Sequence, residues 1–198
     1  MNPEQSLVQL IEEELDNENS FDIWKNSPYK NLVKLQSNNV GKVGEKLVQR
    51  LCENCDIKAN INGVKTKKRG GGAGDGTIKG RTVEIKTAHQ GSKTKSFQHE
   101  YGEMPWKADY VIHVDISPQC IYLTIFENFS EDHYKGGMKC CPYFPTKKTT
   151  WRKGTGCFKL DTTVKINEEN ILRGITFKLT EDTDYEELEE YINEIIKE

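Results

Sequence analysis

The sequence predicts an α/β protein in which helices flank a central mixed β-sheet, within a single domain that spans residues 1–198. Apolar residues recur at helical spacing near both ends of the chain. Short segments typical of strands gather in its centre. A length of 198 residues suits one domain with a sizeable core.

Two helices are expected in the first 54 residues. The first, in residues 6–15, is expected to pack on the domain through Leu7, Leu10, Ile11 and Leu15. The second, in residues 38–54, has an apolar stripe formed by Val40, Val43, Leu47, Val48 and Leu51. Asn38 or Asn39 can cap this second helix.

The strand signals follow. Residues 56–60 suggest a short strand, and a basic, glycine-rich loop leads to strands at 76–79 and 81–87 around a tight turn at Gly80. Residues 89–107 are polar and predict a loop with one helical turn. Two further strands, 109–117 and 119–128, surround a turn at Ser117 and Pro118.

The last third of the chain mixes all element types. A short helix is expected before Gly136, and residues 141–163 are interpreted as a long basic loop with aromatic residues. A helix from 166, a strand at 175–179 and an amphipathic helix over 184–198 complete the expected order.

Charge is segregated, although the net charge is only −3. Residues 1–22 carry seven acidic residues and no Lys or Arg, and residues 181–198 carry nine acidic residues against one lysine. Residues 58–107 carry eleven Lys or Arg against four acidic residues, and residues 139–165 carry seven against one. A basic centre favours a polyanionic partner, and chance alternation on a solvated surface is the alternative.

The cellular setting is expected to be cytoplasmic. No apolar run approaches the roughly 18 residues of a membrane span, and the acidic start does not resemble a signal peptide. The six cysteines are then expected to be free thiols. Cys52 and Cys55, with Cys140 and Cys141, form only a weak zinc pattern, and buried thiols are the favoured interpretation.

One constellation indicates chemistry. Glu84 and Lys86 are two residues apart on a predicted strand, so they project to one face while Val83 and Ile85 can enter the core. The hairpin partner of this strand begins at Asp75. Two neighbouring carboxylates can bind Mg²⁺, and Lys86 can orient water or offset charge on a phosphate.

Asp75, followed by Glu84-Ile85-Lys86, resembles the signature of the restriction-endonuclease-like, or PD-(D/E)xK, nuclease superfamily. The resemblance covers about residues 40–127. It implies that Asp75, Glu84 and the Ile85 carbonyl bind the metal, that Lys86 is the catalytic lysine, and that Glu45 is an accessory acid. A restriction-endonuclease-like fold follows from it, with a catalytic core at about 38–127 and DNA-contacting loops and helices at 139–198.

The sequence departs from the family at Gly74, where the pattern has proline. The alternative interpretation is an exposed hairpin in which a surface Glu and Lys form a weak pair.

Three segments are predicted to contact DNA. Their candidate residues are Lys67, Lys68, Arg69, Lys93, Lys95, Gln98, His99, Lys147, Lys148, Trp151, Arg152 and Lys153. A disordered basic loop at 65–74 and a core role for Trp151 are the alternatives. His113 lies between apolar residues and is interpreted as a core histidine.

The family resemblance implies a Mg²⁺-dependent, sequence-specific endodeoxyribonuclease of the type II restriction class, in which Mn²⁺ can substitute. Such enzymes leave 5′-phosphate ends on double-stranded DNA. A palindromic target would require a homodimer, whose interface the acidic terminal helices could form. ATP is not expected to be needed, because the sequence contains no phosphate-binding loop motif. A homing, repair or junction-resolving nuclease and a non-catalytic DNA-binding protein are the alternatives.

Overall fold

A computed structural model of the chain describes residues 3–20, 22–62, 74–102, 106–135, 138, 140–144, 150–152 and 156–197. The helices are α1 (Pro3–Ser20), the 3-10 helix η1 (Leu32–Lys34), α2 (Ser37–Asn54), α3 (Glu131–Lys135), α4 (Val164–Ile171) and α5 (Tyr185–Ile195). The strands are β1 (Ala59–Ile61), β2 (Gly76–Ile78), β3 (Arg81–His89), β4 (Ser96–Tyr101), β5 (Tyr110–Ile116), β6 (Ile121–Glu127), β7 (Thr150–Arg152), β8 (Cys157–Thr163) and β9 (Thr176–Leu179).

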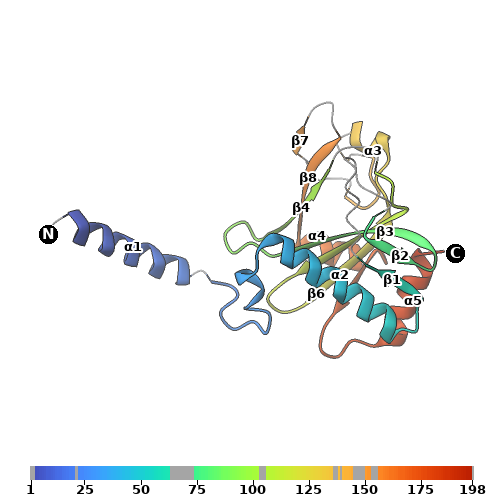
Figure 1. Cartoon of the computed structure of the whole chain (residues 1–198), viewed down its shortest axis with the longest axis horizontal. Helices are drawn as coiled ribbons and strands as arrows, with labels where there is room; N and C mark the ends of the chain where they lie inside the picture. Colours follow the sequence, from blue (N-terminus) through green and yellow to red (C-terminus); the bar gives the residue numbers. More distant parts are fainter. Residues whose placement is uncertain are drawn as a thin grey trace.

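A six-stranded mixed sheet forms the centre, in the order β1-β2-β3-β5-β6-β9 (Figure 1). β3 and β5 are parallel, and the other neighbouring pairs are antiparallel. Apolar side chains of α2 and α5 share one core cluster with the inward residues of β3, β5 and β6. The predicted α/β class with a central mixed sheet is therefore confirmed.

A second, three-stranded sheet, in the order β4-β8-β7, covers part of the opposite face. The prediction of loops at 89–107 and 141–163 is therefore wrong for the segments that form β4, β7 and β8. β4 and β8 do alternate between buried and exposed residues, but some of the buried members are polar, among them His99 and Thr162. Polar residues at core positions hide the two-residue period that identifies a strand.

The first helix forms as predicted, but its packing was predicted wrongly. α1 extends away from the rest of the molecule (Figure 1), and its apolar residues are half exposed or more. α2 begins one residue earlier than expected, after Gln36, without a side-chain cap, so Asn38 and Asn39 lie inside its first turn. Its predicted stripe is correct for Val40, Val48 and Leu51 but not for Val43, which is exposed.

The β2–β3 hairpin turns at Lys79 and Gly80, as predicted. Both residues have positive φ, 51° and 79°. Two consecutive residues with positive φ are typical of a type I′ turn, whose twist matches that of the flanking strands. The hairpin therefore sets a close antiparallel register between β2 and β3.

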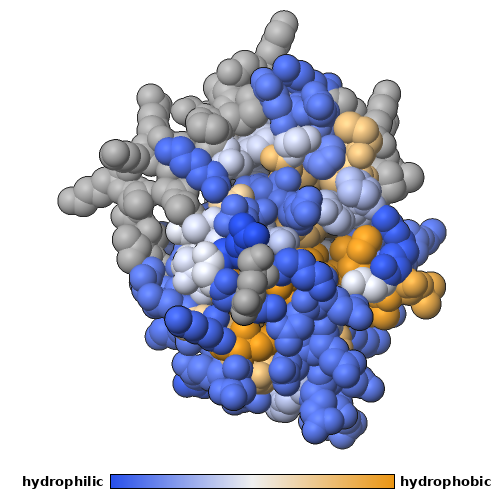
Figure 2. Space-filling model, turned by 90° about the vertical axis from the view of Figure 1, so that its right-hand side faces the viewer, coloured by the Kyte–Doolittle hydropathy of each residue, from blue (hydrophilic) through white to orange (hydrophobic). Residues whose placement is uncertain are grey.

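None of the helices in the described ranges combines the length and the apolar content needed to cross a bilayer. Viewed from the side near the C-terminus, the surface is mostly hydrophilic and is interrupted by separate hydrophobic patches (Figure 2).

Gly44 lies where α2 packs closely against Thr87 of β3. A Cβ atom added to Gly44 would lie 1.8 Å from Thr87 Oγ1 and 2.8 Å from Thr87 Cβ. Rotation of the Thr87 side chain cannot relieve the second contact, so Gly44→Ala is expected to lower the free energy of unfolding by about 1–3 kcal/mol. Gly41→Ala is the matched control, because nothing lies within 4 Å of a Cβ there.

Urea titration followed by circular dichroism measures both variants. Gly41→Ala is expected to be neutral or to stabilise the protein by up to about 1 kcal/mol, because alanine favours the helix over glycine. Equal effects of the two substitutions would contradict the close packing of α2 on β3.

Candidate active site

Glu84 and Lys86 meet on one face of β3. Lys86 Nζ donates a hydrogen bond to Glu84 Oε1 at 2.5 Å. The Lys86 side chain is 24% exposed and the Glu84 side chain is 32% exposed. Val83 and Ile85 are buried in the main core. The predicted alternation along this strand is thus confirmed, and it leaves one carboxylate and one ammonium accessible to solvent.

Asp75 lies next to this pair, immediately before β2. Gly76 pairs with Val83 in the antiparallel register, so Asp75 falls across from Glu84. Asp75 Oδ2 accepts a hydrogen bond from the Ile85 amide at 2.7 Å, and the Asp75 amide donates to the Val83 carbonyl at 2.7 Å. Two bonds to the backbone of β3 therefore hold the carboxyl group of Asp75 at the edge of that strand.

Gly74 has a structural reason to differ from the family pattern. Its φ is +93°, and a Cβ atom there would lie 2.2 Å from the Val83 carbonyl oxygen. Proline, which holds φ near −65°, cannot adopt this conformation. The chain reaches Asp75 through a positive-φ conformation at Gly74, which glycine can adopt and proline cannot.

Negative charge accumulates around Asp75. Burial is the main cause that raises the pKa of Asp75 to about 6, and the charges of Glu84 and Glu45 raise it further. The hydrogen bond from the Ile85 amide and the charge of Lys86 act in the opposite direction. Glu45, half-buried on α2, thus contributes negative charge at Asp75, and its role as an accessory acid stays a prediction.

The oxygen ligands of this site suit a divalent cation that keeps much of its water. Within the described ranges, no group of three or more His, Cys, Asp or Glu side chains is arranged to hold a metal ion. Mg²⁺ commonly takes only one or two carboxylates and completes its shell with waters and substrate phosphate. Asp75, Glu84 and the Ile85 carbonyl fit that requirement. The charges of Glu84 and Glu45, which add to burial in raising the pKa of Asp75, are charges that a cation would offset. Mn²⁺ accepts the same oxygen ligands.

A buried network lies beneath Lys86. Lys86 Nζ lies 5.6 Å from the centre of the Tyr101 ring, and Tyr101 hydrogen-bonds to His113 Nε2. The His113 ring stacks on His99 with centroids 3.8 Å apart. Burial is the main cause that holds the pKa of His113 well below its ordinary value. His113 is therefore a core histidine, as predicted.

Asp115 anchors the other end of this network. Asp115 Oδ1 lies 2.6 Å from His99 Nε2, and Asp115 Oδ2 accepts hydrogen bonds from Thr162 Oγ1 at 2.6 Å and Asn167 Nδ2 at 2.8 Å. The prediction that His99 contacts DNA is wrong, because its side chain is only 1% exposed and hydrogen-bonds to Asp115. The sequence signal that could have shown this is the alternation of Phe97, His99 and Tyr101.

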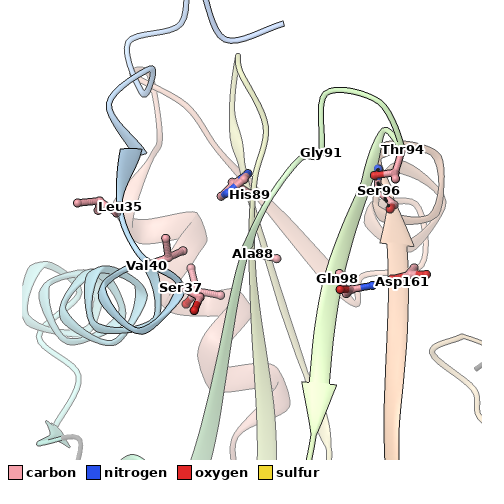
Figure 3. A pocket seen from close by; sticks show the side chains of 11 residues that line it. Leu35, Ser37, Val40, Ala88, His89, Gly91, Thr94, Ser96, Gln98 and Asp161 are labelled. Carbon is pink, nitrogen blue, oxygen red and sulfur yellow. Dashed lines mark hydrogen bonds between the residues drawn. The ribbon is translucent and has the colours of Figure 1, made fainter. Parts of the chain in front are cut away.

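A groove of about 440 Å³ runs from the end of β3 toward β4. Figure 3 shows Ser37 and Val40 of α2 on one side, Gln98 and Asp161 of β4 and β8 on the other, and Ala88 and His89 between them. Ala88 lies two residues beyond Lys86 on β3, so the groove lies near the carboxylate site, although Asp75, Glu84 and Lys86 do not line it.

The predicted DNA-contacting residues are only partly described. Gln98 is exposed and donates a hydrogen bond to Asp161 Oδ1 at 3.2 Å, and Lys93 and Lys95 are exposed in the β3–β4 turn. Trp151 and Arg152 lie in β7. Outside the described residues lie Lys67, Lys68, Arg69, Lys147, Lys148 and Lys153.

The cysteines are free thiols, and those of the weak zinc pattern do not share one core cluster. Cys52 and Cys55 belong to the cluster of α2 and α5, whereas Cys141 belongs to the cluster beneath the second sheet. Burial is the main cause that raises the pKa of the Cys52 thiol to about 12. A thiol kept protonated by apolar packing is a poor zinc ligand.

Comparisons with protein-family models, curated proteins and solved structures give no match to this chain.

Proposed function

We propose that this protein is a Mg²⁺-dependent, sequence-specific endodeoxyribonuclease of the type II restriction class, with a restriction-endonuclease-like fold. The observation that carries the proposal is the meeting of Asp75, Glu84 and Lys86 at one edge of β3. There, Lys86 Nζ bonds to Glu84 and Asp75 is held to the Ile85 amide. Three such groups on adjacent strands match the residue types and the placement that the family resemblance implies.

Each residue has a defined role in this proposal. Asp75, Glu84 and the Ile85 carbonyl hold the cation, which when bound polarises the phosphodiester and activates water. To bind the cation, the Glu84 carboxylate must give up its hydrogen bond from Lys86, which frees the Lys86 ammonium group. Lys86 then orients the attacking water or stabilises negative charge on the phosphate. Glu45 adds negative charge that favours cation binding.

The groove beside the site supports recognition of DNA bases rather than of phosphate alone. Its lining includes the hydroxyl groups of Ser37 and Thr94, the amide of Gln98 and the carboxylate of Asp161. Such groups donate and accept hydrogen bonds to base edges. Lys93 and Lys95, which flank the groove residue Thr94 in the chain, can contact the phosphate backbone. Duplex DNA is thus the proposed substrate, with no requirement for ATP. Free thiols fit a reducing, cytoplasmic setting.

Digestion of a plasmid and of a phage genome in the presence of Mg²⁺, followed by sequencing of the fragment ends, tests the proposal. Discrete fragments with 5′-phosphate ends at one repeated sequence are expected. A smear of fragments would indicate non-specific degradation of DNA and would contradict sequence-specific cutting. Cutting confined to branched or damaged DNA would indicate a repair or junction-resolving nuclease. Binding without any cutting would remove the enzymatic part of the proposal.

Asp75→Asn is expected to reduce cleavage by about 10²-fold or more, because loss of a metal-binding carboxylate removes several kcal/mol of transition-state stabilisation. Asparagine can still accept the hydrogen bond from the Ile85 amide, so the melting temperature should change little. Initial cleavage rates with Mg²⁺, with Mn²⁺ and with a chelator provide the measurement. Asp109→Asn is the matched control, because Asp109 is exposed and its side chain accepts its described hydrogen bonds from Thr82 alone. Equal rates for the two variants would contradict the metal-binding role.

A further inference from the structure

α1 exposes an apolar face. Leu7, Leu10, Ile11 and Leu15 recur at three- and four-residue spacing on this helix, and together with Val8 they are 50–58% exposed. Figure 1 shows α1 extending from the molecule as a single arm. A helix with an apolar stripe of this kind normally buries it against another surface, because isolated helices of this length are marginal in water.

The body of the protein offers an apolar groove of about 410 Å³. Its walls come from the segment before α2, from α2 itself and from the β5–β6 hairpin. They consist of Pro28, Tyr29, Asn31, Leu32, Leu35, Val43, Leu47, Ile116 and Ile121. Val43 and Leu35 are 40% and 39% exposed, although both belong to an apolar surface. A groove of this composition suits the apolar face of a helix.

Charge favours α1 as the occupant. α1 carries Glu4, Glu12, Glu13, Glu14, Asp16 and Glu18 and no lysine or arginine. Exposed cations lie along the chain beside the groove residues, namely Lys30, Lys34, Lys42, Lys46 and Arg50. On α2, Val43, Lys46, Leu47 and Arg50 share one stripe by their spacing. An acidic amphipathic helix is therefore complementary to this groove in both apolar surface and charge.

We propose that two copies of this chain form a dimer by exchanging α1, so that the apolar face of each α1 packs in the groove of the other copy. An 18-residue helix is about 27 Å long, and its outward direction suits contact with a second molecule. Exchange in both directions closes a twofold-symmetric assembly and buries two helix–groove contacts. Two contacts can supply the roughly 1,200 Å² or more that a stable interface requires. This inference does not depend on nuclease activity.

Size-exclusion chromatography with light scattering of the full chain tests the exchange. The wild-type protein is expected to be a dimer. Leu7→Gln/Ile11→Gln/Leu15→Gln, which keeps helix propensity, and Val43→Glu, which places a carboxylate in the groove, should each raise the dimer dissociation constant by about 100-fold or more. Leu172→Glu is the matched control, because Leu172 is 89% exposed and does not line the groove. Circular dichroism should show an unchanged thermal transition in all three variants, apart from helical signal lost where an undocked α1 frays.

Mixing the two monomeric variants distinguishes exchange from folding back. The helix variant retains an intact groove and the groove variant retains an intact helix, so the mixture should form a heterodimer with one restored contact. A wild-type monomer at ~100 μM, where even micromolar association is visible, would overturn the proposal. A dimer that resists both variants would also overturn it. Failure of the mixed variants to form a heterodimer would also overturn the proposal. That result is expected if α1 docks in the groove of its own chain, because mixing then creates no new contact between chains.

Discussion

Lys86→Ala is expected to abolish DNA cleavage while the fold and DNA binding persist. Among the described residues, Lys86 supplies the positive charge that lowers the pKa of Asp75. Its removal takes away the group proposed to orient water and to stabilise the phosphate at the transition state. Loss of one such electrostatic contact typically lowers the rate by about 10²–10³-fold. Single-turnover cleavage rates and a separate gel-shift measurement in Ca²⁺ check the two halves of this expectation.

Lys178→Ala provides a closely matched control. Lys178 Nζ donates to Glu168 Oε1 at 3.0 Å and lies 5.8 Å from the centre of the Tyr122 ring. Lys86 has the same two kinds of partner, Glu84 and the Tyr101 ring. Lys178 is expected to be dispensable for cleavage. Equal losses in both variants would indicate a general effect of removing a lysine–glutamate pair, and an active Lys86→Ala would remove the active-site assignment.

Asp115→Ala is expected to cause the largest loss of stability, about 3–5 kcal/mol in the free energy of unfolding. Asp115 is fully buried and holds His99, Thr162 and Asn167. Truncation leaves three buried polar groups without their partner and opens a cavity between the two sheets. Chemical denaturation monitored by tryptophan fluorescence measures the change.

Asp109→Ala separates burial from the mere loss of an aspartate. Asp109 lies immediately before β5 and accepts hydrogen bonds from the amide and hydroxyl of Thr82, but it is exposed. Because water can replace these bonds, the expected loss is about 1 kcal/mol. A similar loss for both substitutions would show that the Asp115 network does not link the two sheets in the way described.

The candidate site was largely accessible from local sequence. Glu84 and Lys86 stand two residues apart and alternate with the apolar Val83 and Ile85. A strand necessarily turns alternate residues to opposite faces, so Glu84 and Lys86 share one face. The turn at Lys79 and Gly80 then returns the chain so that Asp75 lies across from Glu84. Both inferences involve residues close in sequence, where backbone geometry leaves few choices.

The second sheet was inaccessible for a different reason. β4 and β8 are far apart in sequence, and their buried positions include His99 and Thr162, which are ordinarily counted as polar. These residues can be buried because Asp115, on a third strand, hydrogen-bonds to His99 Nε2 and to Thr162 Oγ1. No local pattern contains that information, since the compensating hydrogen bonds exist only after the strands have met.

By itself, the sequence determined the helix and strand types near the candidate site, the central mixed sheet and the convergence of Asp75, Glu84 and Lys86, because these follow from short-range periodicity and turn geometry. Only the tertiary structure decided that His99 is a core residue, that Gly44 must remain small against Thr87, and that α1 leaves its apolar face exposed. These outcomes depend on contacts, or missing contacts, between distant segments, which the pattern of one segment cannot encode.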